Sequence, residues 1–272
     1  MPVELKPPYL INHAPERGDG RVAVTADVAG AVIEVAVHGR WNPSLRMDAW
    51  AAVSKCFAQH PPMVIVDLHD LGDPLAASAP AWWTMGATGA AMHPPVSVAV
   101  CLPTATALAA RLNRIGVKRQ LSMFATMPEA HVAVTGRAPM VSRVQLEVPP
   151  RPDAVARARD LVGEACETWS LPRLLGPGRL VVAELVANAV EHAGTDATVT
   201  VRRRGGGLHL AVSDGDPRLP SLLDPPPPGR SAPDGRGRGR GLRAVHAATI
   251  AWGALPTATG KVVWAVPRPD PA

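Results

Sequence analysis

The sequence predicts a two-domain protein of the α/β and α+β classes, with a sheet and covering helices in each half. Its 272 residues include 47% hydrophobic ones, which is enough for two modest cores. Strand-like apolar runs alternate with helical stretches in both halves, the pattern of layered sheets and helices. The apolar periodicity lapses between residues 136 and 142. We therefore expect a first domain over residues 1–140, with residues 1–20 as a tail, and a second over residues 141–272.

Strand and helix signals alternate along the first half. Apolar and polar residues alternate over residues 22–27 and 32–38, which predicts a pair of strands. The compact apolar run at 63–68 is typical of a buried parallel strand. The other expected elements are a helix opened by Asn42 and ended by Pro61-Pro62, helices over 79–91 and 104–115, a strand over 96–101 and a short element at 131–134. Together they predict an α/β layer on a largely parallel sheet.

The second half begins with an alternating strand at 143–148, closed by Pro149-Pro150. An amphipathic helix is expected from Pro152 to about residue 170, because its apolar residues recur on one side. The remaining expected elements are a helix over 178–193, strands over 197–202 and 208–212, an apolar helix after the glycine-rich stretch at 237–242, and a closing strand over 260–266. No internal repeat relates the two halves.

The helix at 178–193 carries one polar stripe on an otherwise apolar surface. Spacings of four and three residues place Glu184, Asn188 and Glu191 on one helix face. Burying a carboxylate and an amide among Leu and Val is costly unless they find partners. Magnesium would supply one, because Mg²⁺ accepts one or two protein oxygens and keeps the rest for water and phosphate. The alternative is an ordinary amphipathic helix whose polar face lies in water.

Two further stretches carry chemistry. Asp214 ends an apolar strand beside Gly215, where it can accept a hydrogen bond from an amino group; the alternative is a simple Asp-Gly turn. Downstream, glycines and arginines lead into a helix, and such a helix N-terminus offers free N–H groups to phosphate. These residues are Gly237, Arg238, Gly239, Arg240, Gly241 and Leu242. A solvated linker would look similar, and the stretch matches neither a Walker loop nor a dinucleotide fingerprint.

The order of these boxes, from the Glu-x-x-x-Asn helix through strand-Asp-Gly and the glycine-rich lid to the closing strand, resembles the GHKL ATPase family. Within it, residues 143–267 look like the anti-sigma-factor serine/threonine kinases, which implies a Bergerat-type α/β sandwich. The resemblance implies that Asn188 ligates Mg²⁺ and that Asp214 binds the adenine amino group of ATP. It also implies that Glu184 is the general base for attack on the γ-phosphate, and that the glycines of the lid line the phosphates.

The match has two departures from the family pattern. A small residue usually stands two positions after the Asp of the second box, where this chain has Asp216 followed by Pro217. The closing strand often has Thr after Gly-Lys, where this chain has Val262, so a water-mediated adenine contact is expected to be missing. His192 is expected to be a helix-end residue rather than a ligand.

The first half resembles the anti-sigma-factor-antagonist domain family, the STAS fold. The resemblance lies in its element order, in the phrase Val37-His38-Gly39-Arg40 before a helix, and in the central strand at 64–68. The family's regulatory Asp-Ser-Ser is replaced by the stretch at 72–78, where only Ser78 offers a displaced hydroxyl. A generic α/β domain without this kinship is the alternative reading.

These resemblances imply a transcription regulator that binds Mg·ATP and acts as an anti-sigma factor or as a serine/threonine-protein kinase. Its partners would be a sigma factor, an anti-sigma-factor antagonist protein, or both. Contact between its two fused domains is a further expectation, and homodimerisation is one from the family alone. The alternative is a catalytically weak, nucleotide-gated binding module that transfers no phosphate.

Composition excludes several other classes. No apolar run is long enough for a membrane span or a signal core, so we expect a cytoplasmic protein without a membrane partner. The three cysteines, Cys56, Cys101 and Cys166, are dispersed, which indicates buried thiols in a reducing compartment. The formal net charge of +5 raises nucleic-acid binding, but no aromatic residues interleave with the clustered arginines. We therefore do not expect a nucleic-acid partner.

Overall fold

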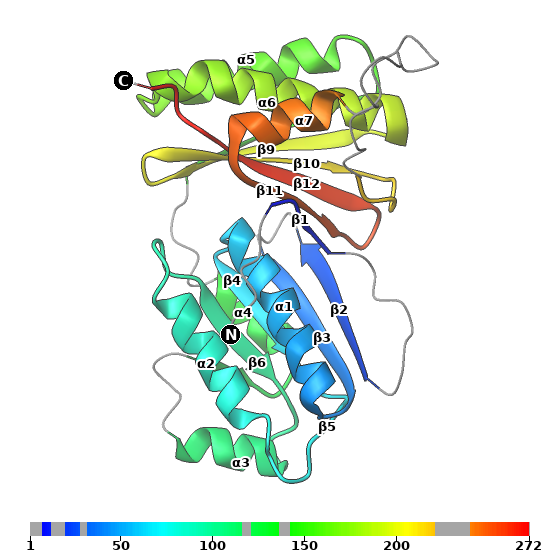
Figure 1. Cartoon of the computed structure of the whole chain (residues 1–272), viewed down its shortest axis with the longest axis vertical. Coiled ribbons are helices and arrows are strands. Elements are labelled where there is room, and N and C mark those ends of the chain that lie inside the picture. The colour runs from blue at the N-terminus through cyan, green and yellow to red at the C-terminus, as the bar shows by residue number, and fades with distance from the viewer. Residues whose placement is uncertain are drawn as a thin grey trace, which may run out of the picture. The chain divides into compact units, whose positions relative to one another are not determined.

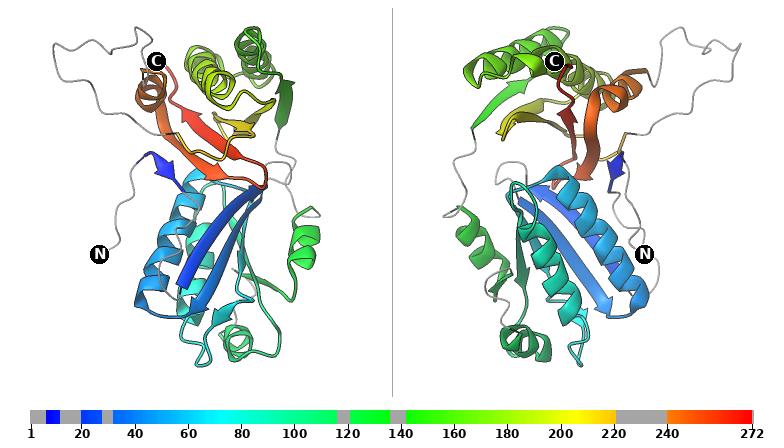
Figure 2. Two further views of the ribbon diagram at one scale, coloured as in Figure 1. Left: turned by 90° about the vertical axis from the view of Figure 1, so that its right-hand side faces the viewer. Right: turned by 60° about the vertical axis from the view of Figure 1, so that its left-hand side comes forward.

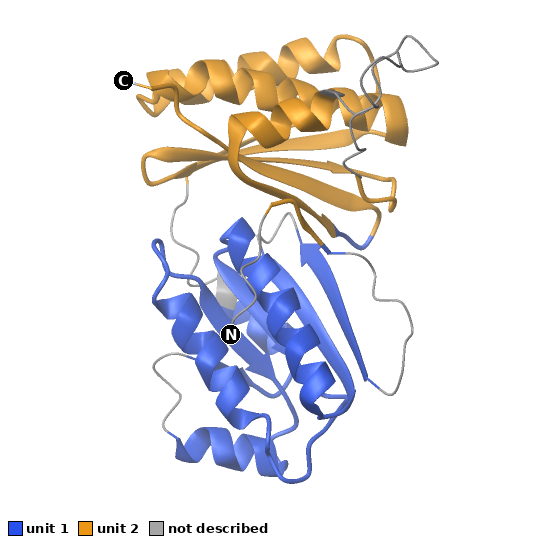
Figure 3. Cartoon of the chain, in the orientation of Figure 1, with its two compact units in different colours: residues 1–5, 11–140, 256–258 blue, residues 6–10, 141–255, 259–272 orange. Residues whose placement is uncertain are grey.

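A computed structural model describes residues 7–11, 20–27, 32–115, 121–135, 142–220 and 240–271. The chain divides into two compact units (Figure 3). Unit 1 comprises Met1–Leu5, Ile11–Met140 and Pro256–Ala258, and unit 2 comprises Lys6–Leu10, Val141–Leu255 and Thr259–Ala272. Each unit contains one sheet with both parallel and antiparallel pairs, together with helices. The prediction of two α/β domains is confirmed.

The sheet of unit 1 has the strand order β2-β3-β4-β6-β7. β2 (Gly20–Asp27) and β3 (Val32–Arg40) form the antiparallel pair that the alternating pattern predicted. The other neighbours pair in parallel, and they are β4 (Met63–Asp67), β6 (Ser97–Cys101) and β7 (Ser122–Phe124). The short β5 (Leu71–Gly72) pairs with the end of β3. Neither β5 nor β7 was predicted from the sequence.

Helices cover both faces of this sheet. They are α1 (Pro43–Gln59), α2 (Ala79–Ala90), α3 (Ala107–Arg114) and α4 (Met127–Thr135). Figure 2 shows α1 on one face and α4 on the other. Asn42 starts α1 as predicted, because its side-chain oxygen accepts a hydrogen bond from the backbone N–H of Leu45 at 2.9 Å. The short element expected at 131–134 lies inside α4.

The sheet of unit 2 has the strand order β1-β11-β12-β10-β9-β8. Its strands are β1 (Tyr9–Leu10), β8 (Arg143–Val148), β9 (Ala197–Arg204), β10 (Gly207–Asp214), β11 (Thr249–Pro256) and β12 (Lys261–Pro267). The sequence predicted β8, β9, β10 and β12, but not β1 or β11. Residues 9 and 10, which the sequence placed in an N-terminal tail, thus form an edge strand parallel to β11.

The helices of unit 2 lie together on one face of its sheet (Figure 1). They are α5 (Ala154–Thr168), the short 3₁₀ helix η2 (Pro172–Leu174), α6 (Leu175–Asn188), the π-helical turn η3 (Ala189–Ala193) and α7 (Arg240–Ala248). Their apolar sides and the facing side chains of the sheet form one mainly aliphatic core, which also contains Trp169 and Trp252. Among the described residues of the chain, no helix is long and apolar enough to cross a membrane.

Candidate functional site

Unit 2 contains a cavity of about 320 Å³ between its helices and its sheet. The cavity is lined from α6, η3, β10 and the loop after it, α7 and β12. Four of the site residues predicted from the sequence line it: Asn188, Asp214, Gly241 and Leu242. Segments far apart in the sequence therefore meet at the place where the predicted boxes lie.

Asn188 is the last residue of α6, and the helix changes character directly after it. The π-helical turn η3 begins at Ala189, and its widened spacing is closed by a hydrogen bond from the N–H of Gly194 to the carbonyl of Ala189 at 3.2 Å. Among the residues that the structure describes, the Asn188 amide nitrogen Nδ2 is buried and has no hydrogen-bond partner. An orphaned amide on the wall of a cavity indicates a polar ligand there.

The widened turn also changes the helix face that the sequence predicted. Glu191 was expected on the same face as Glu184 and Asn188, but it lies within η3, is exposed and does not line the cavity. The regular α-helical spacing on which that expectation rests ends at Asn188.

Glu184 lies one turn before Asn188 and is half-buried. It is not among the side chains that line the cavity. Its carboxylate instead lies against the first turn of α7, so closely that a Cβ at Gly241 would overlap Glu184 Oε2. A Cβ there would also lie 3.9 Å from Asn188 Oδ1. The start of α7 therefore approaches both polar residues of α6, and the missing Cβ of Gly241 leaves room for the Glu184 carboxylate where it lies.

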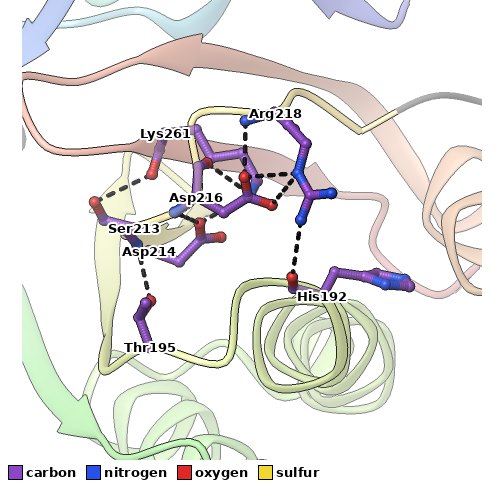
Figure 4. A network of polar contacts seen from close by, with 8 residues as sticks. His192, Thr195, Ser213, Asp214, Asp216, Arg218 and Lys261 are labelled. Carbon is purple, nitrogen blue, oxygen red and sulfur yellow. Dashed lines mark hydrogen bonds and ion pairs between the residues drawn. The ribbon is translucent and has the colours of Figure 1, made fainter.

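Asp214 ends β10 directly opposite Lys261, the first residue of β12. Lys261 Nζ donates to Asp214 Oδ1 at 2.8 Å and to the carbonyl of Asp216 at 2.9 Å (Figure 4). The same Asp214 oxygen accepts from the backbone N–H of Asp216 at 2.9 Å. The side chains of Asp214 and Lys261 are only 2% and 8% exposed. A buried carboxylate thus has a buried counter-ion, which offsets the cost of removing both from water.

Asp216 connects this pair to a second cation. Arg218 Nε donates to both Asp216 carboxylate oxygens, at 3.0 and 3.2 Å, and Arg218 Nη2 donates to the carbonyl of His192 at 3.4 Å. Mainly because of the Arg218 hydrogen bond, the pKa of Asp216 falls to about 2. The same contact raises the pKa of Arg218. The loop after β10 is thereby tied to the C-terminal end of η3.

The backbone around Asp214 is closely packed. Gly215 donates its N–H to Thr195 Oγ1 at 2.9 Å and does not line the cavity. At Gly260 a Cβ would overlap the carbonyl oxygen of Asp214 and the backbone of Gly215. Glycine at position 260 therefore permits β12 to start against the end of β10.

The structure describes the glycine-rich lid from Arg240 onward. Gly237, Arg238 and Gly239 lie outside the described residues, and Arg240 is described only as the backbone start of α7. Leu242 is 8% exposed and belongs to the core of unit 2 as well as to the cavity wall.

Sequence reasoning missed the polar residues that accompany Asp214. Lys261, Asp216, Arg218 and His192 all line the cavity. Asp216 had been noted only as a departure from a small residue, and His192 only as a helix-end residue. The available signal was Lys261 itself, since a charged residue that opens an otherwise apolar strand is buried only with a partner.

In unit 1, Ser78 is fully buried and hydrogen-bonded. Its hydroxyl donates to Asp73 Oδ2 at 2.6 Å and accepts from Trp82 Nε1 at 2.8 Å. Asp73 also accepts from the backbone N–H groups of Ala77 and Ser78, each at 2.8 Å. These contacts give Ser78 a structural role at the start of α2, rather than an accessible hydroxyl.

One protein-family model matches part of this chain. Residues 148–266 match the model of the family described as the histidine kinase-like ATPase domain. No curated protein matches the chain. One similar solved structure is an anti-sigma factor antagonist from Mycobacterium paratuberculosis, with 19% identity and a TM-score of 0.35 over 43% of this chain and 94% of that one.

Proposed function

We propose that this chain, whose residues 148–266 carry a histidine kinase-like ATPase domain, binds ATP with Mg²⁺ in the cavity of unit 2. One observation carries the proposal. Asn188, Asp214 and Gly241 come from three separate segments and line the same cavity. They supply an amide, a carboxylate and a helix N-terminus, the groups suited to a metal ion, a base amino group and phosphate.

The residues present fit such a ligand. The Asn188 amide group lies at the cavity with its nitrogen unpaired among the described residues, and its oxygen would ligate Mg²⁺. Asp214 would accept from the adenine amino group. The N–H groups at the start of α7 would bind phosphate, because the first N–H groups of a helix have no partner within it. Gly215, Gly237, Arg238, Gly239, Arg240 and Leu242 remain proposed contacts of the same ligand.

Phosphate transfer to a protein hydroxyl is the fuller form of this proposal. Bound Mg·ATP would supply the γ-phosphoryl group, with ADP as the leaving group, and Mg²⁺ would neutralise the phosphate charge. Glu184 would orient the acceptor hydroxyl and take its proton. The chain would then act as a serine/threonine kinase towards an anti-sigma-factor antagonist, or as an anti-sigma factor that sequesters a sigma factor.

A nucleotide-gated binder without phosphate transfer is the second candidate. It is favoured by the position of Glu184, whose carboxylate lies against Gly241 and does not line the cavity. In this case ATP would select between conformations of unit 2 with different affinities for a partner protein.

Two measurements decide between these functions. Calorimetric titration of Mg·ATP and Mg·ADP into the whole protein tests nucleotide binding. Incubation with γ-labelled ATP and an antagonist-type protein then tests transfer, with Glu184→Gln as the variant. Label that appears with the wild type and is lost with Glu184→Gln supports the kinase. Nucleotide binding without label supports the binder, and no binding by a folded wild type contradicts both.

We also propose that the fused unit 1 regulates unit 2, because a short tether raises effective concentration to about the millimolar range. A chain trimmed to residues 143–272 would be a poor test. It would lack Tyr9 and Leu10, which pair with β11 inside unit 2. A sound test keeps β1 and compares nucleotide affinity with and without unit 1.

A further inference from the structure

The two oxygens of the Asp214 carboxylate differ in their hydrogen bonds, because the protein donates to Oδ1 alone. Oδ1 accepts from Lys261 Nζ at 2.8 Å and from the Asp216 N–H at 2.9 Å. Among the described residues, every hydrogen bond and ion pair of this carboxylate involves Oδ1, and Oδ2 has no partner. Because Asp214 lines the cavity, this second oxygen is the one left for a ligand.

The ammonium group of Lys261 makes two hydrogen bonds and a longer ion pair with protein oxygens. It has three N–H bonds, and three oxygens surround it: Asp214 Oδ1 at 2.8 Å, the Asp216 carbonyl at 2.9 Å and Asp216 Oδ2 at 3.5 Å. Its side chain is 8% exposed. The ammonium group is thus held by Asp214 and Asp216, and we expect its effect on a ligand to act through Asp214.

We propose that Lys261 is a positioning residue that sets the base selectivity of this pocket. It holds Asp214 as a charged acceptor with a single free oxygen, which selects a 6-amino purine over a 6-oxo purine. The inference rests on the proposed nucleotide binding and names the residue that makes it selective. An adenine amino group donates to Asp214 Oδ2. The carbonyl oxygen of hypoxanthine at the same place would face a carboxylate oxygen, and two acceptors cannot bond to each other.

Removing the ammonium group of Lys261 should change whether Asp214 accepts or donates a hydrogen bond. A buried carboxylate without its counter-ion binds a proton more readily, and the nearby negative charge of Asp216 acts in the same direction. A protonated Asp214 can donate to a 6-oxo group. Arg218 is paired with Asp216, and among the described residues His192 is the remaining titratable side chain that lines the cavity. Selectivity for adenine should therefore fall in Lys261→Met and return as pH rises and Asp214 loses its proton.

The experiment compares ATP with inosine triphosphate, which has the same sugar and phosphates and a 6-oxo base. Calorimetry with Mg²⁺ gives both dissociation constants from pH 6 to pH 9 for the wild type, Lys261→Met and Lys261→Arg. Lys55→Met on α1 of unit 1 is the matched control for the substitution. All variants are repeated with His192→Gln, which removes the histidine side chain from the cavity wall.

The wild type should prefer ATP by roughly 10- to 100-fold at every pH, the range expected for one hydrogen bond to a charged group. Lys261→Met should lose about tenfold of this preference at pH 7 and regain it at higher pH. Lys261→Arg and Lys55→Met should keep it. Wild-type selectivity in folded Lys261→Met across this pH range would overturn the inference, as would a wild type that binds both nucleotides equally.

A second variant keeps the test decisive if Lys261→Met does not fold. The double variant Asp214→Asn/Lys261→Met removes both charges and leaves no buried ion unpaired. Its amide can donate as well as accept, so selectivity should be lost at every pH. Retained selectivity in this variant would contradict the inference. A folded wild type that binds neither nucleotide would instead contradict the proposed function itself.

Discussion

Gly241→Ala should lower phosphate transfer by unit 2 without lowering the thermal stability of the protein. Gly241 is the second residue of α7, and a Cβ at this position would overlap Glu184 Oε2. The overlapped atom is the end of a flexible side chain, so the carboxylate has to move by about 1 Å to restore van der Waals contact. The added methyl group also favours the helix by about 0.5–1 kcal/mol. The variant should therefore fold as well as the wild type while Glu184 is displaced.

A displacement of about 1 Å in a catalytic group can reduce a rate by roughly 100-fold. We expect Gly241→Ala to lower transfer of γ-labelled phosphate to an antagonist-type protein by this order, with an unchanged or higher Tm. Gly176→Ala is the matched control, because Gly176 is the second residue of α6 and its Cβ would meet only Asp270 Oδ2, at 3.4 Å. A folded Gly241→Ala that transfers phosphate at the wild-type rate would refute the role given to Glu184.

Three other predictions concern stability. Gly260→Ala should destabilise unit 2 by about 1–3 kcal/mol or more in denaturant unfolding, because its Cβ would meet only backbone atoms; an unchanged midpoint would contradict the packing described. Lys261→Met should lower the free energy of unfolding by about 3–5 kcal/mol, and adding Asp214→Asn should restore most of this loss. An equal loss in both variants would show that the ion pair does not explain it. In unit 1, the 2.6 Å contact with Asp67 raises the pKa of His69. That stabilisation is complete below the ordinary histidine pKa and is lost as pH rises through the raised value, so the Tm difference between wild type and His69→Gln should shrink between pH 6 and pH 9.

The elements that the sequence predicted are those with a local signal. Alternation marked β2 and β3, and Asn42 marked the start of α1. β1 has only two residues and exists through its pairing with β11, which no local pattern reveals. β11 follows α7 without a break, so the apolar residues of the helix and the strand merge into one run.

α4 shows a signal that was present and overlooked. Its strand-like residues 131–134 follow a Thr-x-x-Glu phrase, in which Glu129 donates its N–H to Thr126 Oγ1 at 3.4 Å. The Glu129 carboxylate accepts in turn from the N–H of Ala125 at 3.1 Å. This reciprocal arrangement is close to a capping box, which starts a helix and outweighs the β-propensity of the valines that follow.

The sequence predicted those site residues whose position depends on a single helix or strand. It did not predict those whose position depends on which residues pair between neighbouring strands. Asn188 followed from helical spacing, and Asp214 from its place at a strand end. Lys261 lies 47 residues after Asp214 and meets it only through the pairing of β10 with β12. The exclusion of Glu191 depends on a π-helical turn, which regular spacing does not anticipate.

The most direct test of the account is the magnesium dependence of ATP binding in Asn188→Ala. The Asn188 amide nitrogen has no partner among the described residues, so its removal should leave Tm nearly unchanged. Calorimetry with and without Mg²⁺ should show that the metal strengthens ATP binding to the wild type by about tenfold or more, and that this gain is lost in the variant. A folded wild type that binds no ATP, or a variant that keeps the full effect of Mg²⁺, would contradict the assignment of this cavity.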